Sequence, residues 1–92
     1  MEEKKIFSKK EFEKLTRNMK IIEHDGYFDG YALYIFIEAK NDNESLWFIR
    51  LQAPNIKTKY LKVQEQDMKW LIELRHTDIE QFLRIMIPFL FS

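Results

Sequence analysis

The residues best suited to chemistry lie in one stretch, DGYALYIFIEAK, which runs from Asp29 to Lys40. It holds two carboxylates, Asp29 and Glu38, and Lys40 follows the second by two positions. Carboxylate oxygens are ligands that hard divalent cations prefer, so metal-assisted hydrolysis is the first chemistry to test. No turn signal follows Gly30, and a strand rises ~3.3 Å per residue, which separates Asp29 from Glu38 by roughly 30 Å. The two carboxylates therefore meet only if the chain turns between them.

Asp29, Glu38 and Lys40 resemble the Asp…Glu-x-Lys signature of the PD-(D/E)xK nuclease superfamily. The resemblance implies two carboxylates that bind a divalent metal and a lysine that assists an attacking water. In that family a turn separates the acids and a core helix follows the lysine, whereas here a turn and a strand are expected after Lys40. The alternative interpretation is a strand that ends in solvated Glu38 and Lys40.

Other reactive groups are sparse. The chain has no cysteine, and its two histidines, His24 and His76, are far apart in sequence. Two glycines four positions apart exclude a glycine-rich phosphate loop. We therefore expect no catalytic residue, no metal and no cofactor, and we regard an enzyme as the less favoured class.

Composition narrows the remaining classes. The 92 residues suit one domain, and 15 basic residues balance 15 acidic ones. This balance lacks the basic excess of most nucleic-acid binders. The start MEEKKIFSKK lacks a signal-like apolar stretch, and the longest apolar run, Ile85–Phe91, is far short of the ~20 residues that span a bilayer. We expect a cytoplasmic protein with no membrane partner.

A helix is predicted to begin after Ser8. Ser8 and Glu11 have the spacing of a capping box, and Phe7 and Phe12 have that of a hydrophobic staple. Apolar residues continue at helical spacing, so the helix is expected to end near Met19 or Lys20.

Strands are predicted next. KIIEHDGYF predicts a short strand, a tight turn at Asp25-Gly26 and a return strand. Further strands are expected over Tyr31–Glu38, Ser45–Gln52 and Lys57–Val63, with a turn at Asn41–Glu44. The result is an antiparallel meander of three to five strands.

The C-terminal third favours helix. Apolar residues from Met68 onward fit one helical stripe with a gap at Arg75-His76, and Thr77 and Glu80 have capping-box spacing. We expect a helix from about Gln66, broken near His76, although Met68–Leu74 also fits a strand. The predicted fold is a single α+β domain over residues 1–92: an N-terminal helix, the meander and a C-terminal helix.

The strands are apolar on both faces. A turn at Asn41–Glu44 pairs Glu38 with Trp47, Phe36 with Ile49 and Tyr34 with Leu51 on one face. The other face is covered by the apolar tail IPFLF at Ile87–Phe91, by a second copy or by a partner. That second face carries the following side chains: Tyr31, Leu33, Ile35, Ile37 and Phe48, with Arg50 and Gln52 at its edge. The residues predicted to bind a protein partner are Tyr31, Leu33, Phe48 and Arg50.

A basic set on adjacent strands supports a second hypothesis, binding of single-stranded nucleic acid by stacking and phosphate contact. KTKYLKVQEQDMKWLIEL resembles the last strand and helix of the Pur-alpha and transcriptional-coactivator single-strand binders. The alternative interpretation is an edge strand whose lysines block unwanted pairing. The set consists of Arg50, Lys57, Lys59, Tyr60 and Lys62.

The favoured hypothesis is a non-enzymatic protein that binds and inhibits another protein, with a homodimer also possible. Amino acids with AT-rich codons (Phe, Tyr, Met, Ile, Asn, Lys) total 42, whereas Gly, Ala, Arg and Pro total 11. This bias and the small size are typical of phage or mobile-element products from a low-GC bacterium. A host defence protein such as a CRISPR effector is the expected target. Nucleic-acid binding is the second hypothesis and a metal nuclease the third.

Overall fold

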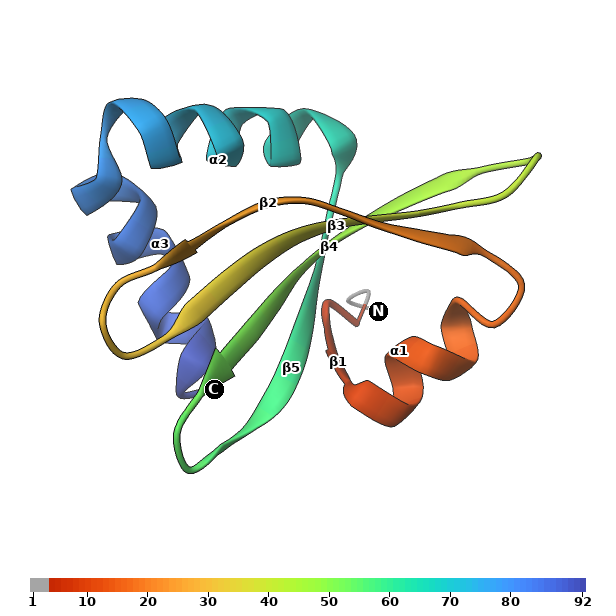
Figure 1. The fold of residues 1–92 in the computed structure, drawn as a ribbon, viewed down its shortest axis with the longest axis horizontal. Helices are drawn as coiled ribbons and strands as arrows, with labels where there is room; N and C mark the ends of the chain where they lie inside the picture. The colour runs from red at the N-terminus through yellow and green to blue at the C-terminus, as the bar shows by residue number, and fades with distance from the viewer. Residues whose placement is uncertain (1–3) are drawn as a thin grey trace.

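A computed structural model describes residues 4–92 as one antiparallel sheet with three helices (Figure 1). The predicted α+β class is confirmed, with the strand order β1-β5-β4-β3-β2. Within residues 4–92 no helix is long and apolar enough to cross a membrane. The elements are β1 (Ile6–Ser8), α1 (Lys9–Leu15), β2 (Lys20–Phe28), β3 (Leu33–Lys40), β4 (Ser45–Ala53), β5 (Ile56–Val63), α2 (Glu65–Thr77) and α3 (Ile79–Leu90).

Helix α1 begins where the sequence predicts. Ser8 Oγ accepts from the Glu11 backbone N–H at 3.1 Å, and Glu11 Oε1 accepts from the Ser8 N–H at 2.9 Å. The predicted end near Met19 or Lys20 is wrong, because α1 stops at Leu15. Thr16 ends it: its backbone N–H and its hydroxyl both donate to the Phe12 carbonyl. A side chain that bonds its own backbone in this way competes with helix continuation.

The central hairpin has the predicted register. Glu38 pairs with Trp47, and four residue pairs further along the strands Tyr34 pairs with Leu51. Asn41 closes the turn, because its backbone N–H donates to the Glu44 carbonyl and its side chain accepts from the Asn43 and Glu44 amides. A polar turn that satisfies its own backbone fixes which face each following side chain occupies.

The predicted turn at Asp25-Gly26 is wrong. Strand β2 continues through it with a register shift between Glu23 and Asp25, a β-bulge. Gly26 serves packing there, since a Cβ at this position would lie 2.8 Å from the Tyr34 carbonyl oxygen. The chain reverses later, at Gly30, whose φ of +96° suits glycine.

The C-terminal third is helical, as expected, and it breaks close to His76. Helix α2 ends at Thr77 and α3 begins at Ile79. The predicted cap at Thr77 is wrong, because the Asp78 carboxylate accepts the Gln81 backbone N–H at 3.2 Å. The two helices turn a corner at Asp78 and lie away from α1 (Figure 1).

Helices α2 and α3 cover the first face of the sheet. Phe82 is fully buried, and its ring meets those of Tyr27, Tyr34 and Phe36 edge-on at 5.6–6.4 Å between centroids. The apolar tail belongs to this face. Its residue Leu90 joins the core cluster that contains Tyr34, as does the preceding Met86. Coverage of the second face by the tail is therefore wrong.

Helix α1 covers one end of the second face instead. Phe12 stacks on Tyr60, with 3.9 Å between ring centroids, and meets Phe48 edge-on at 4.9 Å. These rings form a separate core cluster with Ile37 and Ala39. Because α1 has only seven residues, the far end of this face receives no helix.

Side chains bond backbone groups at one position on each edge of the sheet. At the β1 edge the Ser8 backbone amide donates a hydrogen bond to Glu11 Oε1. At the β2 edge the Gly26 amide donates to Asp25 Oδ1 at 2.8 Å, and the Gly26 carbonyl accepts from Arg75 Nε at 2.9 Å. A strand added at either point meets a backbone group that is already bonded, which protects the edges from unwanted pairing.

Candidate functional site: two open surfaces on opposite faces of the sheet

The half of the second face that α1 leaves bare is the first candidate surface. Phe28 is 62% exposed and Tyr31 47% exposed. A shallow hollow of about 480 Å³ lies between the β2–β3 loop and the β4–β5 turn. We call this surface the open sheet face and define it by Phe28, Tyr31, Leu33, Ile35, Arg50 and Gln52.

One ion pair crosses the open sheet face. Arg50 Nη2 lies 2.8 Å from Glu23 Oε1, and Arg50 Nε donates to Gln52 Oε1 at 3.2 Å. The pair joins β4 to β2 across the intervening β3.

The loop that carries Tyr31 is fixed by Asp29. Its carboxylate accepts from the Tyr31 and Ala32 amides at 2.8 and 2.7 Å and from the Tyr34 hydroxyl at 3.2 Å. Burial alone raises the pKa of Asp29, but these bonds outweigh burial and lower it. The same burial, with the Asp29 charge beside it, raises the pKa of Tyr34. The Tyr31 hydroxyl also reaches the Pro54 carbonyl, which joins the two turns.

Three of the four residues predicted to bind a partner lie on this surface: Tyr31, Leu33 and Arg50. The prediction for Phe48 is wrong, because Phe48 is fully buried beneath Phe12 and Phe7. Sequence alternation placed it on the right face. Only the position of α1 decides which end of that face is covered.

The carboxylates and lysine of the nuclease resemblance do not converge. Asp29 begins the β2–β3 loop, whereas Glu38 lies near the far end of β3. Glu38 instead accepts from Ser45 and pairs with His24, 2.9 Å from His24 Nε2. The His24 bond is the main cause that lowers the pKa of Glu38. Residues 4–92 contain no group of three side chains placed to hold a metal ion.

The predicted nucleic-acid set is divided between the faces. Tyr60 is 5% exposed and stacked on Phe12, so its ring offers no face to a base. Lys59 extends on the first face and donates to the Phe89 and Leu90 carbonyls at 3.2 and 2.9 Å, where it caps α3. Arg50 lies on the second face with Tyr60. Lys57 is exposed and Lys62 is partly buried.

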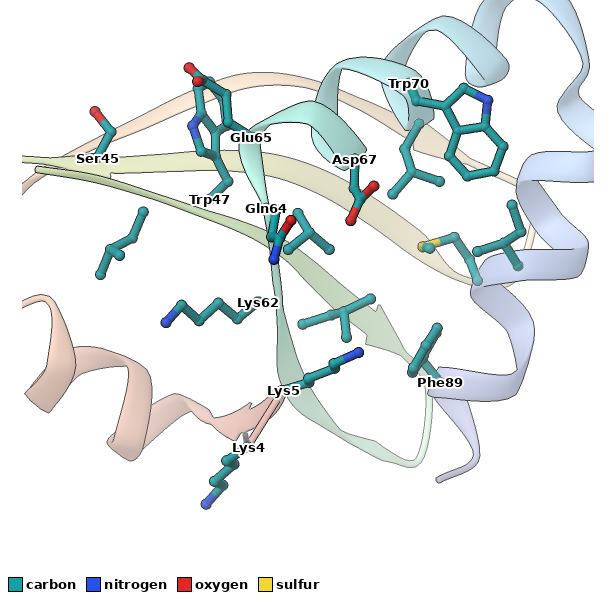
Figure 2. A pocket seen from close by; sticks show the side chains of 16 residues that line it. Lys4, Lys5, Ser45, Trp47, Lys62, Gln64, Glu65, Asp67, Trp70 and Phe89 are labelled. Carbon is teal, nitrogen blue, oxygen red and sulfur yellow. The ribbon is translucent and has the colours of Figure 1, made fainter. Parts of the chain in front are cut away.

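The second candidate surface is a groove of about 980 Å³ on the first face, between α2, α3 and the β1–β5 edge. Figure 2 shows its apolar floor and wall, formed by β5, the start of α2 and the inner side of α3. We call it the helical groove. The apolar residues that line it include Leu61, Val63, Leu71, Ile85, Met86 and Phe89.

The two rims of the helical groove carry opposite charges. Lys5 extends toward the groove from the β1 side, and Glu65 and Asp67 project from the start of α2 on the other side (Figure 2). The Lys62 side chain lies on the second face with Phe48 and points toward α1, but its backbone amide donates to the Lys5 carbonyl at 2.7 Å and so anchors Lys5 to the sheet. Lys4 pairs with Glu11, and this pairing, with the Ser8 amide, lowers the pKa of Glu11 to about 2.

Both tryptophans of the chain line this groove. Trp70 is 49% exposed on α2. Trp47 stacks on His24, and within residues 4–92 its Nε1 is the buried side-chain polar atom that has no hydrogen-bond partner. The sequence analysis missed this site. Its local signal was the acidic start of α2, Glu65 and Asp67, shortly after the β5 segment.

No family model, curated protein or solved structure matches this chain. The function therefore has to be inferred from the chain's own surfaces.

Proposed function

We propose that this chain is a non-enzymatic binding protein that docks on another protein through the open sheet face. The observation that carries the proposal is the pair of exposed rings, Phe28 and Tyr31, beside partly buried Leu33 and Ile35. Burying apolar side chains that now face water favours association.

The open sheet face suits an anchor for recognition. Its strands are paired on both sides over β3 and β4, so the backbone beneath Leu33 and Arg50 is rigid. The Asp29 carboxylate holds the loop beneath Tyr31 by accepting hydrogen bonds from two backbone amides. This order reduces the conformational entropy that the loop loses on binding. Tyr and Arg are also the side chains most enriched among residues that dominate binding energy.

The hydrogen-bonded amides at two edge positions favour docking on a face of the sheet over strand addition at those positions. At Ser8 and Gly26 the edge amides are bonded to Glu11 and Asp25. Strand addition needs such groups free, because main-chain hydrogen bonds supply most of its affinity. A partner that packs across the face needs none of them.

We further propose that the partner is a host protein whose activity is blocked, such as a CRISPR effector. Support comes from the size of the chain and its AT-rich amino-acid usage, both typical of phage products. An inhibitor of this kind needs only a surface that occludes a partner, which the open sheet face provides without catalytic groups.

The test compares three purified proteins: wild type, Phe28→Glu and Phe91→Glu. Phe91 is the matched control, because it is 68% exposed but ends α3, which packs on the first face. Tagged proteins are incubated with lysate of a low-GC bacterium, and bound proteins are quantified by mass spectrometry. A specific partner should be retained by wild type and Phe91→Glu and lost with Phe28→Glu. Binding of the purified partner then gives the affinities.

Inhibition is measured by phage plating on a host with an active CRISPR system that expresses each protein. Wild type and Phe91→Glu should restore plating, and Phe28→Glu should not. The binding proposal fails if no protein separates wild type from Phe28→Glu. Saturable, salt-sensitive anisotropy of a labelled single-stranded oligonucleotide would instead favour the nucleic-acid hypothesis.

A further inference from the structure

We propose that the helical groove binds an amphipathic α-helix of a protein partner, with the acidic flank of that helix beside Lys5 and its basic flank beside Glu65 and Asp67. This site is separate from the open sheet face, because the two lie on opposite faces of the sheet. Either proposal can therefore fail while the other stands.

The shape and floor of the groove fit a helix. Its walls are themselves helices, α2 and α3, and its floor is the surface of β5. Leu61 and Val63 of β5 line the floor, and Ile85 and Phe89 of α3 line the wall. Figure 2 labels Phe89 at this wall. A helix that presents apolar side chains at positions i, i+3 or i+4, and i+7 lays such a stripe into a hydrophobic groove.

The rim charges define the orientation of the occupant. Asp67 extends from α2 toward the floor, and Lys5 approaches from the opposite side (Figure 2). Lys5, Glu65 and Asp67 are exposed, so rim contacts select partners and direction more than they add affinity. An occupant with one acidic and one basic flank satisfies both rims in one direction and opposes both in the other.

Two other occupants fit less well. A strand would need free main-chain groups beside the groove, but the Lys5 carbonyl there already accepts from the Lys62 amide. A second copy of this chain placed face to face would set one hollow against another. Such a contact leaves a void, whereas stable interfaces pack as densely as protein interiors.

The test begins with selection from a display library of random 16-residue peptides, with the full chain as the target. We expect the enriched peptides to share an apolar stripe at i, i+3 or i+4, and i+7, with acidic residues on one flank and basic residues on the other. Because Trp47 and Trp70 line the groove, a synthetic enriched peptide should change the intrinsic fluorescence saturably. Circular dichroism should show helix gained on binding.

A charge exchange then tests the orientation. Lys5→Glu combined with Asp67→Lys reverses the charge on the β1 side and cancels the charge on the α2 side without changing net charge, and it should weaken the selected peptide by about tenfold. A peptide with its acidic and basic residues exchanged should regain affinity for this variant. The matched control is Lys10→Glu with Glu13→Lys on the exposed side of α1, which should stay within about twofold of wild type.

Three outcomes would overturn the proposal: enrichment of peptides without helical periodicity, no enrichment, or equal binding to wild type and the exchanged variant. Sedimentation equilibrium of the chain alone tests the second copy. A dimer weakened by the Lys5–Asp67 exchange, and not by the control exchange, would assign the groove to self-association and reject the helix.

Discussion

The two faces of the sheet use the same strands but are covered to different extents. The first face lies beneath α2 and α3, which together supply 25 helical residues, and its core contains eleven buried residues. The second lies beneath the seven residues of α1, and its core contains five. An apolar sheet face therefore does not imply a covered one, because coverage depends on the length and position of the helices.

This difference separates stability from recognition. Fully buried side chains contribute through packing, and their loss leaves cavities. Exposed apolar side chains such as Phe28 contribute little to folding and remain available to a partner. The predictions that follow compare the covered first face, the covered end of the second and the open end.

The largest loss of stability is expected from Phe82→Ala on the first face. The ring is fully buried against three aromatic rings, and such truncations cost about 3–5 kcal/mol. Urea denaturation followed by far-UV circular dichroism measures the change in unfolding free energy. A loss below about 1 kcal/mol would contradict the assignment of the main core to this face.

Phe12→Ala should rank second, with a loss of about 3 kcal/mol. Phe12 joins α1 to Tyr60 and Phe48, but its core is smaller and closer to solvent. The matched control is Leu15→Ala, because Leu15 lies on the same helix and is 44% exposed. That control should change stability by about 0.5 kcal/mol or less in the same denaturation experiment. Equal losses for the two variants would show that α1 does not bury Phe12.

Asp29→Asn should cost about 1 kcal/mol at pH 7, because an amide oxygen accepts weaker hydrogen bonds than a carboxylate. The pKa of Asp29 is lowered by folding from its ordinary 3.8, so its charge stabilises the fold fully above that pH. As pH falls through the folded pKa this contribution is lost. Denaturation of both proteins from pH 7 to 3 should show the difference shrinking below about pH 4. A difference in unfolding free energy that stays constant with pH would show that the Asp29 charge is not its cause.

Phe28→Ser should have the smallest effect on stability, about 0.5 kcal/mol or less, while it weakens any partner that docks on the open sheet face. Phe48→Ser is its counterpart on the covered end of the same face, since Phe48 is fully buried and Phe28 is 62% exposed. Phe48→Ser should lower the melting temperature several-fold more than Phe28→Ser in parallel thermal melts. Similar melting temperatures for the two variants would remove the distinction between the ends of the face.

Local signals in the sequence predicted the elements that close their own hydrogen bonds. The Ser8–Glu11 capping box and the Asn41 turn each satisfy backbone groups within three residues, so their geometry is fixed locally. The turn then set the register of β3 and β4. The same reasoning failed at Asp25-Gly26. Glycine is needed there because the neighbouring strand leaves no room for a Cβ, and the local sequence does not reveal that contact.

The candidate surfaces were predicted in part. Strand alternation placed Tyr31, Leu33 and Arg50 on the right face, and it placed Phe48 there too. The helical groove was not predicted, since its rims come from β1, β5 and α2, and residues such as Lys5 and Asp67 are brought together by β1–β5 pairing.

The sequence by itself determined the α+β class, the capped start of α1 and the alternation of each strand, because these depend on contacts between near neighbours. Tertiary structure alone decided that the apolar tail packs on the first face and that α1 reaches only one end of the second. Both outcomes follow from where three helices of unequal length can lie on a twisted sheet. The arrangement of the helices minimises the exposed apolar area of the whole chain, so it cannot be predicted from a local sequence pattern.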